Sequence, residues 1–191
     1  MATEIRTIAV IGAGHDGREF AYAALRAGYR TILEDVSDSR LEQAIAWIAS
    51  VDADASSRLV ASRTVEAAVR EADLIIEAVA DEMEMKIEMF TIFDKFAKPD
   101  AILASSSRSV PIAELVAVTF CPEHCVGMRF VSVAGHADAL ELVRTPRTSE
   151  KTIARCREVG RRMGKDVAVA AESVELPEIP ELPEIRQDRQ R

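Results

Sequence analysis

The sequence has few cysteines, few aromatic residues and no long hydrophobic stretch, and each shortage excludes a class of protein. Three cysteines in 191 residues form no disulfide framework, which favours a reducing compartment. No apolar run approaches the roughly 20 residues of a membrane-spanning helix, and the mean hydropathy is only +0.02. The first residues, MATEIRTIAV, lack the basic and apolar regions of a signal peptide. We therefore expect a cytoplasmic protein that does not associate with membranes.

Positive charge is also scarce, because 24 Lys and Arg residues face 32 Asp and Glu residues, giving a net charge of −8. An acidic chain of this kind is not expected to have nucleic acid as its main partner. Hydrophobic residues make up 48% of the chain, which is enough for a core and excludes wholesale disorder. The length allows one medium domain with a tail.

Short apolar segments alternate with helical patterns, which is typical of βα units and a mostly parallel sheet. The segment Thr7–Ile11 is predicted to be a strand buried on both faces. We expect an α/β, Rossmann-like, doubly wound sheet with helices on both faces, formed by residues 1–171. The predicted strands are 7–11, 30–33, 58–62, 73–79, 101–104, 126–131, 139–143 and 167–170, and the predicted helices are 18–27, 41–48, 65–70, 83–96 and 150–163.

The composition changes near Ala171. Proline recurs every third residue in LPEIPELPEI, residues 176–185, which excludes a helix or central strand and favours polyproline II. We assign residues 172–191 to an acidic proline-rich tail. A solvated tail is the favoured interpretation, and a strap that docks on the domain or on a partner protein is the alternative.

A glycine-rich turn, GAGHDG at residues 12–17, follows the first predicted strand and opens the first helix. This is the context that dinucleotide binding requires. Gly12 permits a tight turn, Gly14 lets the backbone approach a pyrophosphate, and Gly17 lets the helix pack closely on the strand. Asp35, after the second strand, is placed to accept hydrogen bonds from ribose hydroxyls. Its charge would repel a 2′-phosphate, so NAD is favoured over NADP.

One loop superficially resembles a metal site. Cys121, His124 and Cys125 offer at most three ligands within five residues, and no second cluster complements them. We expect no metal site.

The sequence resembles the NAD-binding domain of the 3-hydroxyacyl-CoA dehydrogenase family over nearly all of residues 5–170. That family uses NAD to oxidise a 3-hydroxyacyl-CoA to the 3-ketoacyl-CoA, so the resemblance implies NAD as cofactor. The stretches that carry it are AVIGAGHDGREFAYAALRAGY, ADLIIEAVADEMEMK, AILASSSRSVPIAELV, VGMRFVSV, LELVRTPRTSEKTI and VGRRMGKDVAV.

The resemblance also implies which residues contact the cofactor. Asp81 stands where the family usually has Glu, and Ser106 replaces an asparagine. Lys86 matches a lysine that reaches the nicotinamide ribose, although the sequence without this resemblance favours a solvated helix lysine. The implied cofactor-binding residues are Gly12, Ala13, Gly14, Gly17, Asp35, Ala78, Val79, Asp81, Lys86 and Ser106.

The catalytic positions depart from the family pattern. Arg129 stands where the family has its general base, a histidine, and Arg108 replaces a serine that contacts substrate. Glu141, which orients the histidine in the family, is retained. Arginine stays protonated and cannot take a hydroxyl proton. We expect Arg129 to form an ion pair with Glu141, and polarisation of a carbonyl in the reduction direction is the alternative.

Family enzymes continue with a helical domain that supplies part of the acyl-CoA site, where this chain has its acidic tail. We therefore expect an NAD-binding domain with little or no dehydrogenase activity of its own. One alternative is an active oxidoreductase on 3-hydroxyacyl-CoA-type substrates, acting alone or completed by a partner chain. The other is a non-catalytic interaction module that docks through its tail.

Overall fold

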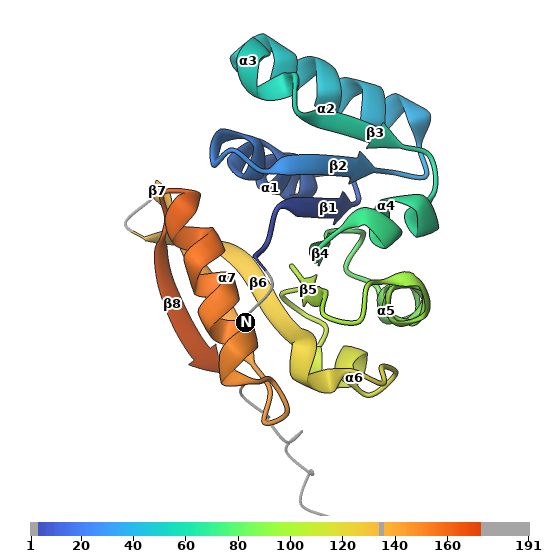
Figure 1. Ribbon diagram of the computed structural model, residues 1–191, viewed down its shortest axis with the longest axis vertical. Helices are drawn as coiled ribbons and strands as arrows, with labels where there is room; N and C mark the ends of the chain where they lie inside the picture. The colour runs from blue at the N-terminus through green and yellow to red at the C-terminus, as the bar shows by residue number, and fades with distance from the viewer. Residues whose placement is uncertain (1–3, 134–135, 173–191) are drawn as a thin grey trace, which may run out of the picture.

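The computed structural model describes residues 4–133 and 136–172, which form one eight-stranded sheet with helices on both faces (Figure 1). The strand order is β3-β2-β1-β4-β5-β6-β7-β8, and the neighbours are parallel except β6 and β7. The expected Rossmann-like fold class is confirmed. The strands are β1 (Thr7–Ile11), β2 (Arg30–Glu34), β3 (Leu59–Ser62), β4 (Leu74–Glu77), β5 (Ile102–Ser105), β6 (Cys125–Val133), β7 (His136–Arg144) and β8 (Asp166–Ala171).

Two hydrophobic cores hold the helices against the sheet. Side chains alternate across a strand, so Ile8 and Val10 of β1 lie in one core while Ala9 and Ile11 lie in the other. The first core includes residues of α1, α2 and α7, and the second includes residues of α4, α5 and α6. The helices are α1 (His15–Arg26), α2 (Asp38–Val51), α3 (Ala53–Ser56), α4 (Val65–Glu71), α5 (Met83–Phe96), α6 (Ile112–Val116), α7 (Glu150–Arg162) and the 3-10 helix η1 (Pro122–His124).

Local capping explains where the helices differ from the predicted ranges. Helix α1 begins at His15, three residues early, because Gly14 is already its N-cap residue. The predicted ranges contain no helix between residues 48 and 65, but the structure has the short helix α3 there, which Asp52 caps by accepting a hydrogen bond from the Ala55 N–H at 2.9 Å. Helices α6 and η1 were not predicted. Such short turns lack the apolar repeat from which longer helices are recognised.

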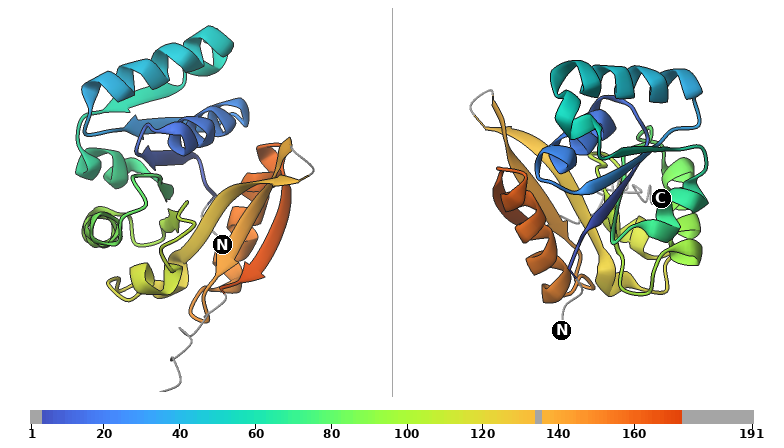
Figure 2. Two further views of the ribbon diagram at one scale, coloured as in Figure 1. Left: turned by 180° about the vertical axis from the view of Figure 1, so that it is seen from behind. Right: turned by 45° about the horizontal axis from the view of Figure 1, so that its top comes forward.

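The last three strands form the part of the sheet against which α7 packs (Figure 2). The antiparallel pairing of β6 and β7 places Arg129 directly opposite Glu141. Beyond β8, the Glu172 N–H donates to the Arg144 carbonyl at 2.9 Å, and the Glu172 carboxylate accepts the Ala113 N–H at the start of α6. Glu172, which we assigned to the tail, is thus anchored to the domain. The proline repeat lies outside the described residues.

No helix within residues 4–133 and 136–172 is long and apolar enough to cross a bilayer.

Candidate functional site

The glycine turn joins β1 to α1 at the carboxyl edge of the sheet. Gly12 has φ +103°, and a Cβ there would lie 2.5 Å from the Ala78 carbonyl oxygen. A Cβ on Gly17 would lie 1.8 Å from the Gly12 carbonyl oxygen, whereas a Cβ on Gly14 would meet nothing within 4 Å. The first and third glycines are therefore required by backbone packing. The second leaves open space beside the first N–H groups of α1, where an anion is favoured.

Asp35 fastens this turn to the start of α2. Its Oδ2 accepts the Ala13 N–H at 2.8 Å, and its Oδ1 accepts the Ser37 N–H at 2.7 Å. The guanidinium of Arg40 donates to the same Oδ1 through Nε and Nη2, at 3.1 and 3.0 Å. The Asp35 side chain is only 6% exposed, while that of Arg40 is 57% exposed. Arg40 is therefore the more accessible of the two charged groups.

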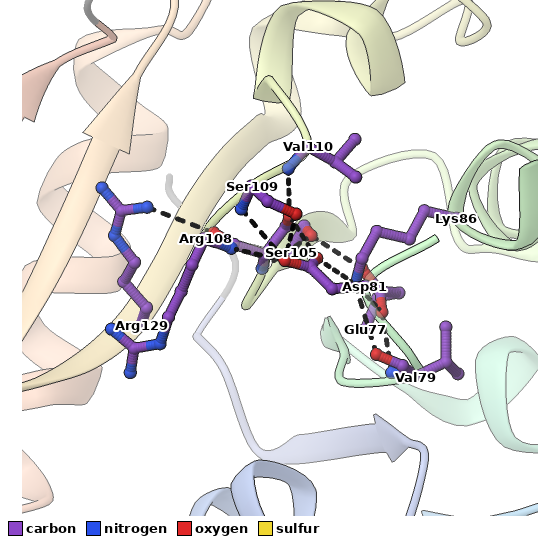
Figure 3. A network of polar contacts seen from close by, with 10 residues as sticks. Glu77, Val79, Asp81, Lys86, Ser105, Arg108, Ser109, Val110 and Arg129 are labelled. Carbon is purple, nitrogen blue, oxygen red and sulfur yellow. Dashed lines mark hydrogen bonds and ion pairs between the residues drawn. The ribbon is translucent and has the colours of Figure 1, made fainter. Parts of the chain in front are cut away.

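A buried ion pair lies at the end of β4 (Figure 3). The Lys86 ammonium donates to both carboxylate oxygens of Glu77, at 2.8 and 2.9 Å, and both residues are at most 1% exposed. Glu77 also accepts the Ser105 hydroxyl at 2.6 Å and the Val79 N–H at 2.8 Å. A buried charge needs such partners. Lys86 is thus not the solvated helix lysine that the sequence alone favoured.

Asp81 accepts several hydrogen bonds from the loop between β5 and α6, residues 106–111, called here the serine-rich loop. Its Oδ1 accepts the Ser107 hydroxyl at 2.6 Å, and its Oδ2 accepts the Ser109 hydroxyl at 2.6 Å and the Ser109 N–H at 3.0 Å. Burial alone would raise the pKa of Asp81, but these hydrogen bonds and the Lys86 charge hold it well below its usual value. Asp81 therefore stays ionised and links the ion pair at β4 to the serine-rich loop.

Arg108, within that loop, and Arg129, on β6, are the two arginines for which the sequence predicts a place in the catalytic site. Arg129 donates from Nε to Glu141 Oε2 at 2.6 Å and from Nη1 to the Ser107 carbonyl at 3.2 Å. The expected ion pair with Glu141 is confirmed. Arg108 donates from Nη2 to the Phe130 carbonyl at 2.6 Å. Arg108 thus ties the loop to β6, and Arg129 ties β6 to the loop, each through a backbone carbonyl.

Several of these residues, among them Gly14, Arg40 and Lys86, border a cavity of about 460 Å³, called here the groove. It runs from the glycine turn and Arg40 to the serine-rich loop. A second cavity of about 770 Å³ lies alongside, and His15, Asp16 and Arg108 line both. The residues that line the groove are Gly14, His15, Asp16, Arg40, Ala78, Val79, Ala80, Asp81, Lys86, Ser106, Ser107 and Arg108.

Six of the ten residues implied as cofactor contacts line the groove. They are Gly14, Ala78, Val79, Asp81, Lys86 and Ser106. Gly12, Ala13, Gly17 and Asp35 instead form the turn and its support. The groove thus brings together most, but not all, of the predicted set.

Sequence reasoning missed Glu77, Ser105 and Arg40. Glu77 had a signal, because a carboxylate at the end of the apolar strand LIIE requires a buried partner. Arg40 had none, since its role depends on how α2 begins.

The loop with Cys121 and Cys125 lies elsewhere: Cys125 is buried, and the Cys121 thiol donates to Asp94 at 3.5 Å. Within the residues that the structure describes, no three His, Cys, Asp or Glu side chains gather to hold a metal ion.

Comparison with known proteins identifies similar sequences and folds. The family model described as "3-hydroxyacyl-CoA dehydrogenase, NAD binding domain" matches residues 7–173. The 3-hydroxybutyryl-CoA dehydrogenase of Bradyrhizobium diazoefficiens is 32% identical over 90% of this chain and 63% of its own length. A probable 3-hydroxybutyryl-CoA dehydrogenase of Bacillus subtilis is 35% identical over 85% of this chain and 61% of its own. This chain therefore spans less than two thirds of these relatives.

Solved structures agree with the sequence comparison. The (S)-3-hydroxybutyryl-CoA dehydrogenase PaaH1 of Ralstonia eutropha superposes with a TM-score of 0.82 at 26% identity, over 89% of this chain and 65% of that one. An NAD⁺-dependent 5-formyl-3-hydroxy-2-methylpyridine-4-carboxylic acid 5-dehydrogenase superposes with a TM-score of 0.79, also at 26% identity, over 88% of this chain and 59% of that one.

Proposed function

This chain belongs to the 3-hydroxyacyl-CoA dehydrogenase NAD-binding domain family, and from that premise we propose that it binds NAD(H) in the groove without catalysing the family's dehydrogenase reaction on its own. The fit to a dinucleotide rests on the glycine turn. Gly14 offers open space beside the N-terminus of α1, while Gly12 and Gly17 have no room for a side chain. A pyrophosphate placed there would receive backbone N–H groups and the positive end of the helix dipole.

The other end of the groove would hold the nicotinamide half. Ala78, Val79 and Ser106 line it at the ends of β4 and β5, where ligands of such sheets bind. Lys86 and Asp81 also line the groove. The ammonium of Lys86 is paired with the carboxylates of Glu77 and Asp81. NAD would supply the hydride acceptor at this place.

The ion pair between Arg129 and Glu141 is the observation that argues against catalysis. Oxidising an alcohol requires a group that accepts the hydroxyl proton. The Arg129 guanidinium is permanently protonated, and its Nε–H is already donated to Glu141 at 2.6 Å. It cannot act as that base, although its remaining N–H groups can still hold an anion or a carbonyl oxygen.

The test combines binding with turnover on one preparation. We expect calorimetry to show saturable NADH binding, and we expect acetoacetyl-CoA not to accelerate NADH oxidation measurably. Steady-state turnover by the purified chain would contradict the second half of the proposal and favour an active oxidoreductase instead. Arg129→His is the matched variant, because it restores the residue type that the family uses opposite Glu141 and replaces no residue that lines the groove, although it removes the hydrogen bond to the Ser107 carbonyl.

A further inference from the structure

Arg40 changes what the adenine-ribose end of the groove presents to a ligand. Asp35, the residue that marks this end, is buried and already accepts four hydrogen bonds, two from backbone N–H groups and two from Arg40. Arg40 lines the groove, and its side chain is more than half exposed. A dinucleotide entering here therefore meets the guanidinium rather than a bare carboxylate.

The charge balance follows from this pairing. An isolated carboxylate at this position would repel a 2′-phosphate, which carries a charge of about −1.5 to −2 at neutral pH. The guanidinium of Arg40 compensates the charge of Asp35 at 3.0 Å. Its two bonds to Oδ1 use two of its five N–H groups, so three remain. A guanidinium is well suited to bind a phosphate through such paired donors.

Resting on the proposed NAD(H) site, we propose that Arg40 sets the cofactor specificity of the groove, so that a dinucleotide with a 2′-phosphate is accepted as well as one with a 2′-hydroxyl. Arg40 receives the phosphate with its remaining N–H groups. Asp35 keeps its hydrogen bonds from the backbone N–H groups of Ala13 and Ser37. The glycine turn therefore remains in place when the Arg40 side chain changes its position to bind the phosphate. The specificity predicted from Asp35 alone, NAD over NADP, is thereby weakened.

The experiment is a calorimetric titration of the full chain with NADH and with NADPH. We expect the two dissociation constants of the unaltered chain to lie within about tenfold of each other. In Arg40→Gln, the ratio of the NADPH constant to the NADH constant should rise by about tenfold or more, as expected for losing a charge-assisted phosphate contact. Arg40→Lys, which keeps the charge but loses the fork of donors, should give an intermediate ratio.

Arg30→Gln is the matched control. Arg30 is also an arginine in a surface ion pair, with Glu71 at 2.8 Å, but it lies at the opposite end of β2. Its ratio should equal that of the unaltered chain, and circular dichroism confirms that each variant is folded. More than 100-fold discrimination against NADPH by the unaltered chain, or an unchanged ratio in Arg40→Gln, would overturn the inference alone. Failure of the unaltered chain to bind NADH would overturn the proposed function itself.

Discussion

The buried pair of Lys86 and Glu77 should be the most sensitive charged contact in the domain. Lys86→Met removes an ammonium that is 1% exposed and leaves the Glu77 carboxylate, 0% exposed, without its counter-charge. Breaking a buried pair by removing one partner costs about 3–5 kcal/mol. Glu77 keeps the Ser105 hydroxyl at 2.6 Å and the Val79 N–H at 2.8 Å, and methionine fills similar space. We therefore expect the lower end, a loss of about 3 kcal/mol.

Urea unfolding followed by circular dichroism measures this loss, which corresponds to a fall of about 6–12 °C in the thermal midpoint. The double variant Lys86→Met/Glu77→Gln should lose less than Lys86→Met alone, because no uncompensated charge remains buried. Arg30→Met is the control, since its exposed ion pair with Glu71 should contribute at most about 1 kcal/mol. A loss below about 1 kcal/mol in Lys86→Met would refute the reasoning.

Two further predictions test the glycine turn and the strand beside it. Gly17→Ala should destabilise the fold by about 3 kcal/mol or more, because its Cβ would lie 1.8 Å from a backbone oxygen. Gly14→Ala should change the free energy of unfolding by less than about 1 kcal/mol and yet weaken NADH binding. Equal losses of stability of the two variants in urea titrations would show the explanation to be wrong. Burial, followed by the charges of Asp35 and Glu66, raises the pKa of Glu34 from 4.5 to about 7. Between these values the folded chain holds a proton that the unfolded chain has lost, so this contribution to stability is present below about pH 4.5 and declines as the pH rises through 7. Glu34→Gln should remove the decline and be more stable than the unaltered chain at pH 8 by up to about 3 kcal/mol; parallel pH profiles for the two proteins would contradict this.

The parts of the fold set by periodicity and by glycine were predictable from the sequence. Helix α5 spans Met83–Phe96, as its amphipathic pattern predicts, and β1 spans the expected Thr7–Ile11. Helix α1 ends just before Gly28, which has φ +87°. The glycine turn follows from its motif, and the ion pair of Arg129 with Glu141 follows from the permanent charge of an arginine at the position that the resemblance places beside Glu141.

The remaining parts depend on contacts between elements. Lys86 is buried because α5 places it over the end of β4, next to Glu77. The pattern of a single helix does not reveal a contact with a residue of another element. Arg40 reaches Asp35 only because Ser37 caps α2 between them. The roles assigned to these residues in cofactor binding stay predictions, as does the docking of the proline-rich tail.

The central claim, that the groove binds NAD(H), is tested most directly by calorimetric titration of NADH into the purified chain. We predict a saturable heat signal with one NADH per chain, reduced in Gly14→Ala although that variant remains folded. Absence of a signal above the heat of dilution at millimolar NADH would contradict the claim.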